Sequence, residues 1–142
     1  MFSVVNSLPH QLGKRNDWAT CHTSAGTFPR LGVSTTNNGI VEGQQTTFTV
    51  SGSSGFIQSD IETSDGLYII FIDDDNEKNV HTFSTLVCGQ NGLPSCPIKA
   101  GTPFTVYISV AVPQFPDAFD VYAVIGNPPD RTLGCAYTNE WP

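Results

Sequence analysis

Few side chains of this chain could carry out nucleophilic catalysis. The three histidines, His10, His22 and His81, are far apart, and no serine stands in a Gly-x-Ser-x-Gly motif. A nucleophile also needs an adjacent general base, and no cysteine is left free if all of them form disulfides. The sequence therefore indicates no catalytic residues and no cofactor, and we expect that the protein is not an enzyme.

One acidic run is similar to a calcium-binding loop. Residues 73–77 read Asp-Asp-Asp-Asn-Glu, but an EF-hand loop that began at Asp73 would need Gly at its sixth position and Glu at its twelfth. The chain has Lys78 and Ser84 at these positions. We interpret the run as a solvated hairpin turn and expect no metal site.

A glycosidase would need a pair of carboxylates that face each other across the bond to be cleaved. The acidic residues that could meet in this way are Asp60, Glu62, Asp117 and Asp120. Their spacing does not favour such a pair. A small secreted hydrolase is therefore kept only as a lesser alternative.

The four cysteines have the clearest chemical meaning. An even number in a turn-rich chain, without the close Cys-x-x-Cys pairs of zinc sites, indicates two disulfides formed in an oxidising compartment. Four cysteines allow three pairings, and the sequence alone does not choose among them. Spacing favours Cys88 with Cys96, because glycines and a proline between them permit a tight loop. This leaves Cys21 with Cys135, which would tie the first strand to the last.

The composition fits one small domain that is rich in turns. The chain has 142 residues, of which 13% are charged, and its many Gly, Pro, Ser, Thr and Asn residues suit short strands joined by turns. We expect residues 17–142 to form this domain. Residues 1–16 are expected to be an N-terminal tail, disordered or processed, and their apolar start is too short for a secretory signal.

The charge excludes some classes of partner. The net charge is −7 and the chain has only six Lys and Arg residues, so it lacks the basic surface that binds nucleic acid. Acidity also disfavours anionic membranes, which leaves transient membrane contact through a small apolar rim. No stretch approaches the roughly 20 apolar residues of a membrane span. We expect a monomer.

Apolar residues recur with the period of β-strands. From Phe104 to Val112 every second residue is apolar, which predicts a strand with one buried face. The continuous apolar run from Leu67 to Ile72 is the best candidate for a central strand buried on both faces. Further strands are predicted at Thr46–Val50, His81–Val87, Phe119–Ile125 and Leu133–Tyr137. About seven short strands at this spacing predict an all-β, immunoglobulin-like two-sheet β-sandwich.

One sequence pattern is more specific than the strands themselves. The short cysteine loop leads into Cys96-Pro97-Ile98-x-x-Gly101, which precedes the alternating strand, a proline turn at Pro113–Pro116 and Leu133-x-Cys135. In these features residues 17–142 resemble the ML (MD-2-related lipid-recognition) domain family. This family includes the Niemann-Pick type C sterol carrier and fungal phosphatidylglycerol/phosphatidylinositol transfer proteins. The carboxy-terminal half contributes most of the resemblance.

The resemblance implies both a fold and a function. In ML domains two sheets splay apart and hold a lipid between them, and a disulfide joins the first and last strands, as expected here for Cys21 and Cys135. A further disulfide common near the N-terminus of the family is missing. The resemblance implies a protein that holds one sterol, fatty acid or phospholipid in a hydrophobic cavity and carries it between membranes or partners. It also implies a secreted protein or one of the vacuolar or lysosomal lumen.

The apolar residues expected to face inward would then line the lipid site, because a lipid tail would complete a core that the splayed sheets leave unfilled. They are Phe48, Val50, Leu67, Ile69, Phe71, Phe83, Leu93, Ile98, Phe104, Val106, Ile108, Val110, Phe115, Phe119 and Val121. The phase of the strand from Phe119 stays open, since Tyr122 and Val124 could face inward instead.

The mouth of this site is expected around Leu93, Ile98 and Phe115, beside the cysteine loop and the proline turn. Lys99 could meet a lipid phosphate or carboxylate there, although an exposed lysine is the simpler interpretation. For each lining residue, ordinary core packing explains the apolar side chain equally well. The main alternative function is therefore an immunoglobulin-like recognition or adhesion domain with a filled core.

Overall fold

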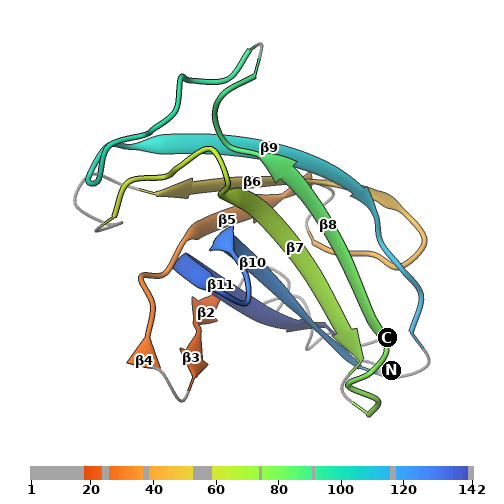
Figure 1. Ribbon diagram of the computed structural model, residues 1–142. Coiled ribbons are helices and arrows are strands. Elements are labelled where there is room, and N and C mark those ends of the chain that lie inside the picture. Colours follow the sequence, from red (N-terminus) through yellow and green to blue (C-terminus); the bar gives the residue numbers. More distant parts are fainter. Residues whose placement is uncertain are drawn as a thin grey trace.

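The computed structural model describes residues 18–23, 26–36, 39–52, 59–73, 75–90, 92–115 and 118–140, and all its elements are β-strands (Figure 1). The expected tail at residues 1–16 lies outside these residues, as do His10 and Asp117. The described residues contain no helix with the length and apolarity of a membrane span.

The strands form two main antiparallel sheets, which confirms the expected all-β two-sheet sandwich. The larger sheet has the order β2-β11-β10-β7-β8 and the smaller one the order β5-β6-β9. The strands of the larger sheet are β2 (Ala19–Thr20), β7 (Gly66–Asp73), β8 (Val80–Leu86), β10 (Phe119–Asn127) and β11 (Arg131–Glu140). Those of the smaller sheet are β5 (Gly32–Thr35), β6 (Gln45–Gly52) and β9 (Phe104–Ala111). The two sheets lie one above the other in Figure 1, and β3 (His22–Thr23) and β4 (Gly26–Thr27) form a separate short hairpin.

Strict alternation decides which side chains reach the space between the sheets. In β7 the odd-numbered residues are buried and the even-numbered ones from Tyr68 are half-buried, so β7 is an interior strand of the sheet but is not buried on both faces as the sequence predicts, and β10 is the middle strand. Neighbours directly opposite in a sheet share a face. Phe71 pairs with Val121, so Val121 faces inward and Tyr122 faces outward, which decides the phase that the sequence left open.

A continuous line of aromatic rings crosses the interior. Phe48 of the smaller sheet lies edge-on to Phe71 of the larger one, with 6.4 Å between ring centroids, and Trp18 extends the line on one side of Phe48. On the other side Phe71 contacts Phe83 and Phe119 at 5.9 and 6.2 Å. Edge-on and tilted rings at these distances attract one another. The rings therefore hold the sheets together through their side chains.

Backbone hydrogen bonds join the two sheets on one side. The Cys135 N–H donates to the Pro29 carbonyl at 2.9 Å, and the Leu31 N–H donates to the Cys135 carbonyl at 3.4 Å. The segment around Arg30 thus runs beside β11 before it enters β5 of the smaller sheet. On the other side, in the described part of the chain, β8 pairs only with β7 and β9 only with β6. That side has no backbone ladder between the sheets.

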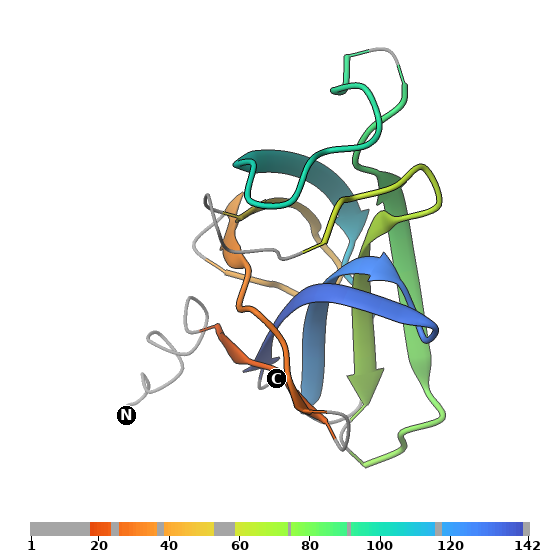
Figure 2. The same cartoon turned by 60° about the vertical axis from the view of Figure 1, so that its left-hand side comes forward.

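Two disulfides join Cys21 to Cys135 and Cys88 to Cys96. This is the pairing that the spacing favours. The Cys21–Cys135 disulfide lies on the side where backbone hydrogen bonds join the two sheets. The second closes a loop that projects beyond both sheets, at the top of Figures 1 and 2.

The Cys21–Cys135 disulfide should contribute more stability than Cys88–Cys96. The bridged residues are 114 and 8 positions apart, and in the chain-entropy account such loops restrain the unfolded chain by about 5 and about 2.5 kcal/mol. We expect replacement of Cys21 and Cys135 by alanine to lower the free energy of unfolding in urea about twice as much as replacement of Cys88 and Cys96. Equal losses, or the reverse order, would contradict this account.

Candidate functional site: an apolar interior with two different ends

All of the predicted lining residues except Leu93 meet between the sheets. They form one buried cluster with partly buried neighbours, namely Phe48, Val50, Leu67, Ile69, Phe71, Ile98, Phe104, Val106, Val110, Phe115, Phe119 and Val121, with Phe83 and Ile108 packed against them. Leu93 is half-buried in the cysteine loop outside this cluster. The alternating pattern of β6, β7 and β9 placed these side chains correctly because each strand has one face toward the core.

Other members of the cluster escaped the sequence argument. They are Trp18, Leu31, Ile40, Ile61, Cys88, Ala123, Ile125, Leu133 and Ala136, whereas Val87 and Val112 of the same cluster lie where the strand pattern already pointed inward. Trp18, Leu31, Ile40 and Ile61 lie in segments without a periodic pattern, so nothing in the sequence marks their direction. Ala123 and Ile125 do continue the alternation that begins at Phe119, and that signal was available.

The expectation that Leu93, Ile98 and Phe115 share one mouth is wrong. Ile98 and Leu93 precede β9 and Phe115 follows it, so the length of an eight-residue strand, roughly 26 Å, separates them. The register agrees, because Phe104 pairs with Gly52 at one end of β6 and Ala111 with Gln45 at the other. The interior thus has a cysteine-loop end and a proline-turn end, and these ends differ in chemistry.

Phe115 closes the proline-turn end with aromatic contacts. It follows β9 of the smaller sheet, yet its ring stacks on Phe119 of the larger sheet with 4.8 Å between centroids. The ring of His81, on the edge strand β8, meets Phe115 edge-on at 5.6 Å. The Phe115 N–H donates to a Glu42 carboxylate oxygen at 2.6 Å, which fixes the backbone of the turn. Among the described residues, aromatic side chains thus link the two sheets at this end.

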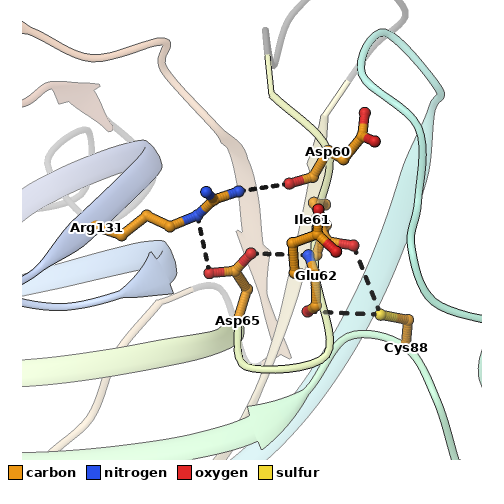
Figure 3. Close-up of polar contacts among 6 residues, drawn as sticks. All are labelled: Asp60, Ile61, Glu62, Asp65, Cys88 and Arg131. Carbon is orange, nitrogen blue, oxygen red and sulfur yellow. Dashed lines mark hydrogen bonds and ion pairs between the residues drawn. The ribbon is translucent and has the colours of Figure 1, made fainter.

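Polar contacts close the cysteine-loop end (Figure 3). Ile61 and Ile98 exchange backbone hydrogen bonds of 2.8 and 2.9 Å, which tie the segment before β7 to the segment before β9. Arg131 donates to the Asp60 carbonyl at 2.6 Å, and its Nε lies 3.2 Å from Asp65 Oδ1. The second oxygen of Asp65 accepts the Glu62 N–H at 2.8 Å. These bonds fix the loop between residues 60 and 65 over the interior.

The contact between Arg131 and Asp65 is an ion pair without a linear hydrogen bond. Neither Nε nor Oδ1 has a hydrogen-bond partner by geometry, although the two atoms are 3.2 Å apart. The Asp65 side chain is fully buried and that of Arg131 is 40% exposed. The position of Arg131 depends on a bulge at Gly126, where any Cβ would collide with the Arg131 carbonyl and φ is +150°. The sequence argument missed this pair because its members are far apart along the chain.

The polar residues considered for catalysis or metal binding are used in the structure of turns. Asp73 Oδ1 accepts the N–H groups of Asp75 and Asn76 at 2.9 and 3.3 Å, as in a hairpin turn. Asp60 contacts Lys99 at 3.6 Å and accepts the Ala100 N–H. Among the described residues no three His, Cys, Asp or Glu side chains are grouped as a metal site.

The candidate carboxylate pair is not brought together by the described residues. Asp60 lies near the start of β7, whereas Asp120 pairs with Ile72 near its end and hydrogen bonds to Asn139. Asp60 and Glu62 belong to the same loop, and the Asp60 carboxylate accepts the Ala100 N–H. Asp117 lies outside the described residues. Two carboxylates facing each other across a cleft are therefore not found in this part of the chain.

An apolar hollow of about 290 Å³ lies on the outer face of the larger sheet. Ile70 and Tyr122 contribute to it from β7 and β10, and both point away from the interior. Its wall is formed by Cys21, Phe28, Ile70, Ile72, Tyr122, Val124, Pro128, Thr132 and Cys135. The hollow is thus separated from the interior by the thickness of the sheet.

Comparison with known proteins finds similarity among solved structures but not in sequence. No family model matches the chain, and no curated protein is similar to it in sequence. Among solved structures, the crystal structure of chicken MD-1 complexed with lipid IVa is similar over 87% of this chain and 87% of that chain, with 15% sequence identity and a TM-score of 0.47.

Loss of Arg131 should destabilise the protein more than loss of Lys99. Arg131→Gln leaves the buried Asp65 carboxylate without a cation, which should cost about 2 to 4 kcal/mol. Lys99 is 76% exposed and pairs with Asp60 at the surface, so Lys99→Gln should cost less than about 1 kcal/mol. Urea unfolding of the two variants measures the difference. Similar losses in the free energy of unfolding would mean that the Arg131–Asp65 pair contributes little to the stability of the cysteine-loop end.

Proposed function

We propose that the protein is an ML-type lipid-binding protein that holds one lipid between its two sheets. The observation that supports this best is the meeting of apolar side chains from both sheets in an interior where, among the described residues, no ladder joins the edge strands β8 and β9. Along the side of β8 and β9 the two sheets can therefore separate without breaking a ladder of backbone hydrogen bonds. The ML-like pattern around Cys96-Pro97-Ile98 supports the same function independently.

Burial of a lipid tail supplies enough free energy for binding. Each methylene removed from water contributes about 0.8 kcal/mol, so a tail of about a dozen methylenes yields on the order of 10 kcal/mol before the costs of association. Part of that gain offsets the contacts that the aromatic rings must give up. The proposed activity needs no covalent step, so it requires neither a nucleophile nor a cofactor.

The ligand is proposed to pass between β8 and β9 at the proline-turn end. Both strands are sheet edges, and among the described residues the sheets contact each other there through side chains. Phe115 and His81 form that link, and His81 is exposed to solvent. The cysteine-loop end is held by backbone hydrogen bonds and by the Arg131–Asp65 pair, so opening it would break more polar contacts. Displacement of one aromatic ring is the smaller change.

The finer features of the function follow from the family resemblance. We propose residues 17–142 as one ML-type domain that carries a sterol, fatty acid or phospholipid between membranes or protein partners. Two disulfides suit a secreted protein or one in a vacuolar or lysosomal lumen. A monomer that contacts membranes transiently is the simplest form of such a carrier.

The ring contacts favour a second candidate function. Phe48, Phe71, Phe83 and Phe119 already contact one another across the interior. Such contacts would fill the core of an immunoglobulin-like recognition or adhesion domain, which needs no internal ligand. In that case binding would use the outer surface, and the interior would serve stability alone.

A fluorescent fatty-acyl or sterol probe should bind with one site per chain. Because the site is interior, an unlabelled lipid should displace the probe, and saturating lipid should raise the midpoint of thermal unfolding. Native mass spectrometry of the purified protein should show the added mass of one lipid. Repeated absence of probe binding and of lipid mass would reject the carrier and favour the filled-core domain.

Phe115→Ala should accelerate release of the bound probe. It removes the ring that links the sheets at the proposed opening, and a fall of about 1.4 kcal/mol in the barrier would give a tenfold faster dissociation. Stopped-flow measurement of probe dissociation tests this. Phe104→Ala is the matched control, because Phe104 and Phe115 are 8% and 6% exposed in the same cluster but lie at opposite ends of β9.

Both variants should lose about 3 to 5 kcal/mol of stability, as expected for buried phenylalanine. Only Phe115→Ala should change the dissociation rate strongly. If Phe104→Ala were the faster variant, the ligand would pass through the cysteine-loop end instead.

A further inference from the structure

Two hydroxyl groups in the inner wall of the smaller sheet have no hydrogen-bond partner. Thr46 is 0% exposed, and its Oγ1 is buried without a partner in the described structure. The Oγ1 of Thr35 on β5 is buried in the same way. Thr46 pairs with Val110 and Thr35 with Phe48, both members of the buried cluster. Both threonines therefore face the interior.

The two hydroxyls lie close together. Thr35 stands opposite Phe48 on the neighbouring strand, and Thr46 is two residues from Phe48, so the threonines occupy diagonal positions on one face. Such positions are roughly 7 to 8 Å apart. One polar group between them could contact either hydroxyl or both. They form a small polar spot in a wall that is otherwise apolar.

Threonines on the other face of the same sheet behave differently. The hydroxyl of Thr47 shares a hydrogen bond of 2.6 Å with Ser109, and the hydroxyl of Thr36 accepts the Thr47 N–H at 3.0 Å. The outward hydroxyls thus have partners although they could also bond to water. The inward ones are shielded from bulk water and lack protein partners, which costs free energy unless something else bonds to them.

We propose that Thr35 and Thr46 hydrogen bond to a neutral polar group of the lipid held between the sheets. This inference rests on the proposed function and specifies its ligand class as a lipid with an uncharged hydroxyl, ester or amide. A hydroxyl side chain can both donate to and accept from such a group. The polar group of the ligand supplies the hydrogen-bond partner that the two threonine hydroxyls lack in the described structure.

The surrounding charges favour a neutral group over an anion. The buried polar residues in the described structure are Thr46, Asp65, Asp73 and Thr138, so none of them is a cation. Asp73 lies at the same end of β7 as the aromatic contacts of Phe119, and Glu42 binds the neighbouring turn. A buried carboxylate or phosphate would meet no positive partner there and would be repelled by these acids.

The position of the threonines also gives the ligand an orientation. Thr46 is the second residue of β6 and Thr35 the last of β5, both near the proline-turn end. The apolar wall continues from Phe48 to Gly52, toward the cysteine-loop end. The lipid therefore lies with its tail toward the cysteine loop and its polar group near the proposed opening.

The test compares 1-hexadecanol with hexadecane, each displacing a bound fluorescent acyl probe from the full chain. Wild-type protein should bind the alcohol about three to ten times more tightly, as expected for a neutral hydrogen bond in a buried site. Thr35→Val/Thr46→Val should lose this preference and keep its affinity for hexadecane. Thr47→Val, which alters a hydroxyl of the outer face, should keep the preference.

Stability supplies an independent measurement. Valine has nearly the shape of threonine without its hydroxyl, so Thr46→Val should unfold at a higher urea concentration than wild type when no lipid is bound. A lower urea midpoint would mean that the hydroxyl already has a partner such as an internal water, and would overturn the inference. A preference for the alcohol that persists in the double variant would overturn it while leaving lipid binding intact. Binding of no probe at all by wild type would reject the proposed function itself.

Discussion

The sandwich depends on an unequal joining of its two sheets, because backbone hydrogen bonds run along one side and are found on the other only at the cysteine-loop end of the described residues. The segment from Pro29 to Leu31 hydrogen bonds to Cys135 of β11 and then continues into β5, so covalent chain and backbone bonds connect the sheets there. The disulfide from Cys21 to Cys135 secures this side in the folded chain. The β8 and β9 edges lack such a ladder, so away from the Ile61–Ile98 backbone bonds at the cysteine-loop end their separation breaks side-chain contacts. A hinge-like opening follows from this asymmetry.

The same asymmetry explains why the two ends of the interior differ in chemistry. Near the cysteine loop, the backbone hydrogen bonds between Ile61 and Ile98 and the ion pair of Arg131 with Asp65 hold the segment around Ile61 over the core. Near the proline turn, stacked rings supply attraction that tolerates sliding, because offset aromatic pairs have broad minima. The polar end is thus suited to stay closed, and the aromatic end to move.

The sequence predicted the fold where one physical signal dominates. Alternation in β9 identified Phe104 and Val106 as inward-facing because one face of that strand is buried and the other is exposed to solvent. The short strands β2 and β5 carry too few residues to show a period. Contacts between distant residues, such as Arg131 with Asp65, leave no mark in local spacing. The predicted position of the mouth is wrong for a related reason. Ile98 and Phe115 flank one strand, and the length of that strand separates them.

The aromatic line sets the limit on how tightly any lipid can bind. In the structure, rings such as Phe71 and Phe83 attract one another by dispersion and by their edge-on geometry. A lipid must replace these contacts before its own burial counts, and the net affinity is smaller than the buried area suggests. The unpartnered hydroxyls of Thr35 and Thr46 differ in this respect, because they make no protein hydrogen bond that a ligand would have to break. Selectivity among lipids should therefore depend on that polar spot more than on the apolar walls.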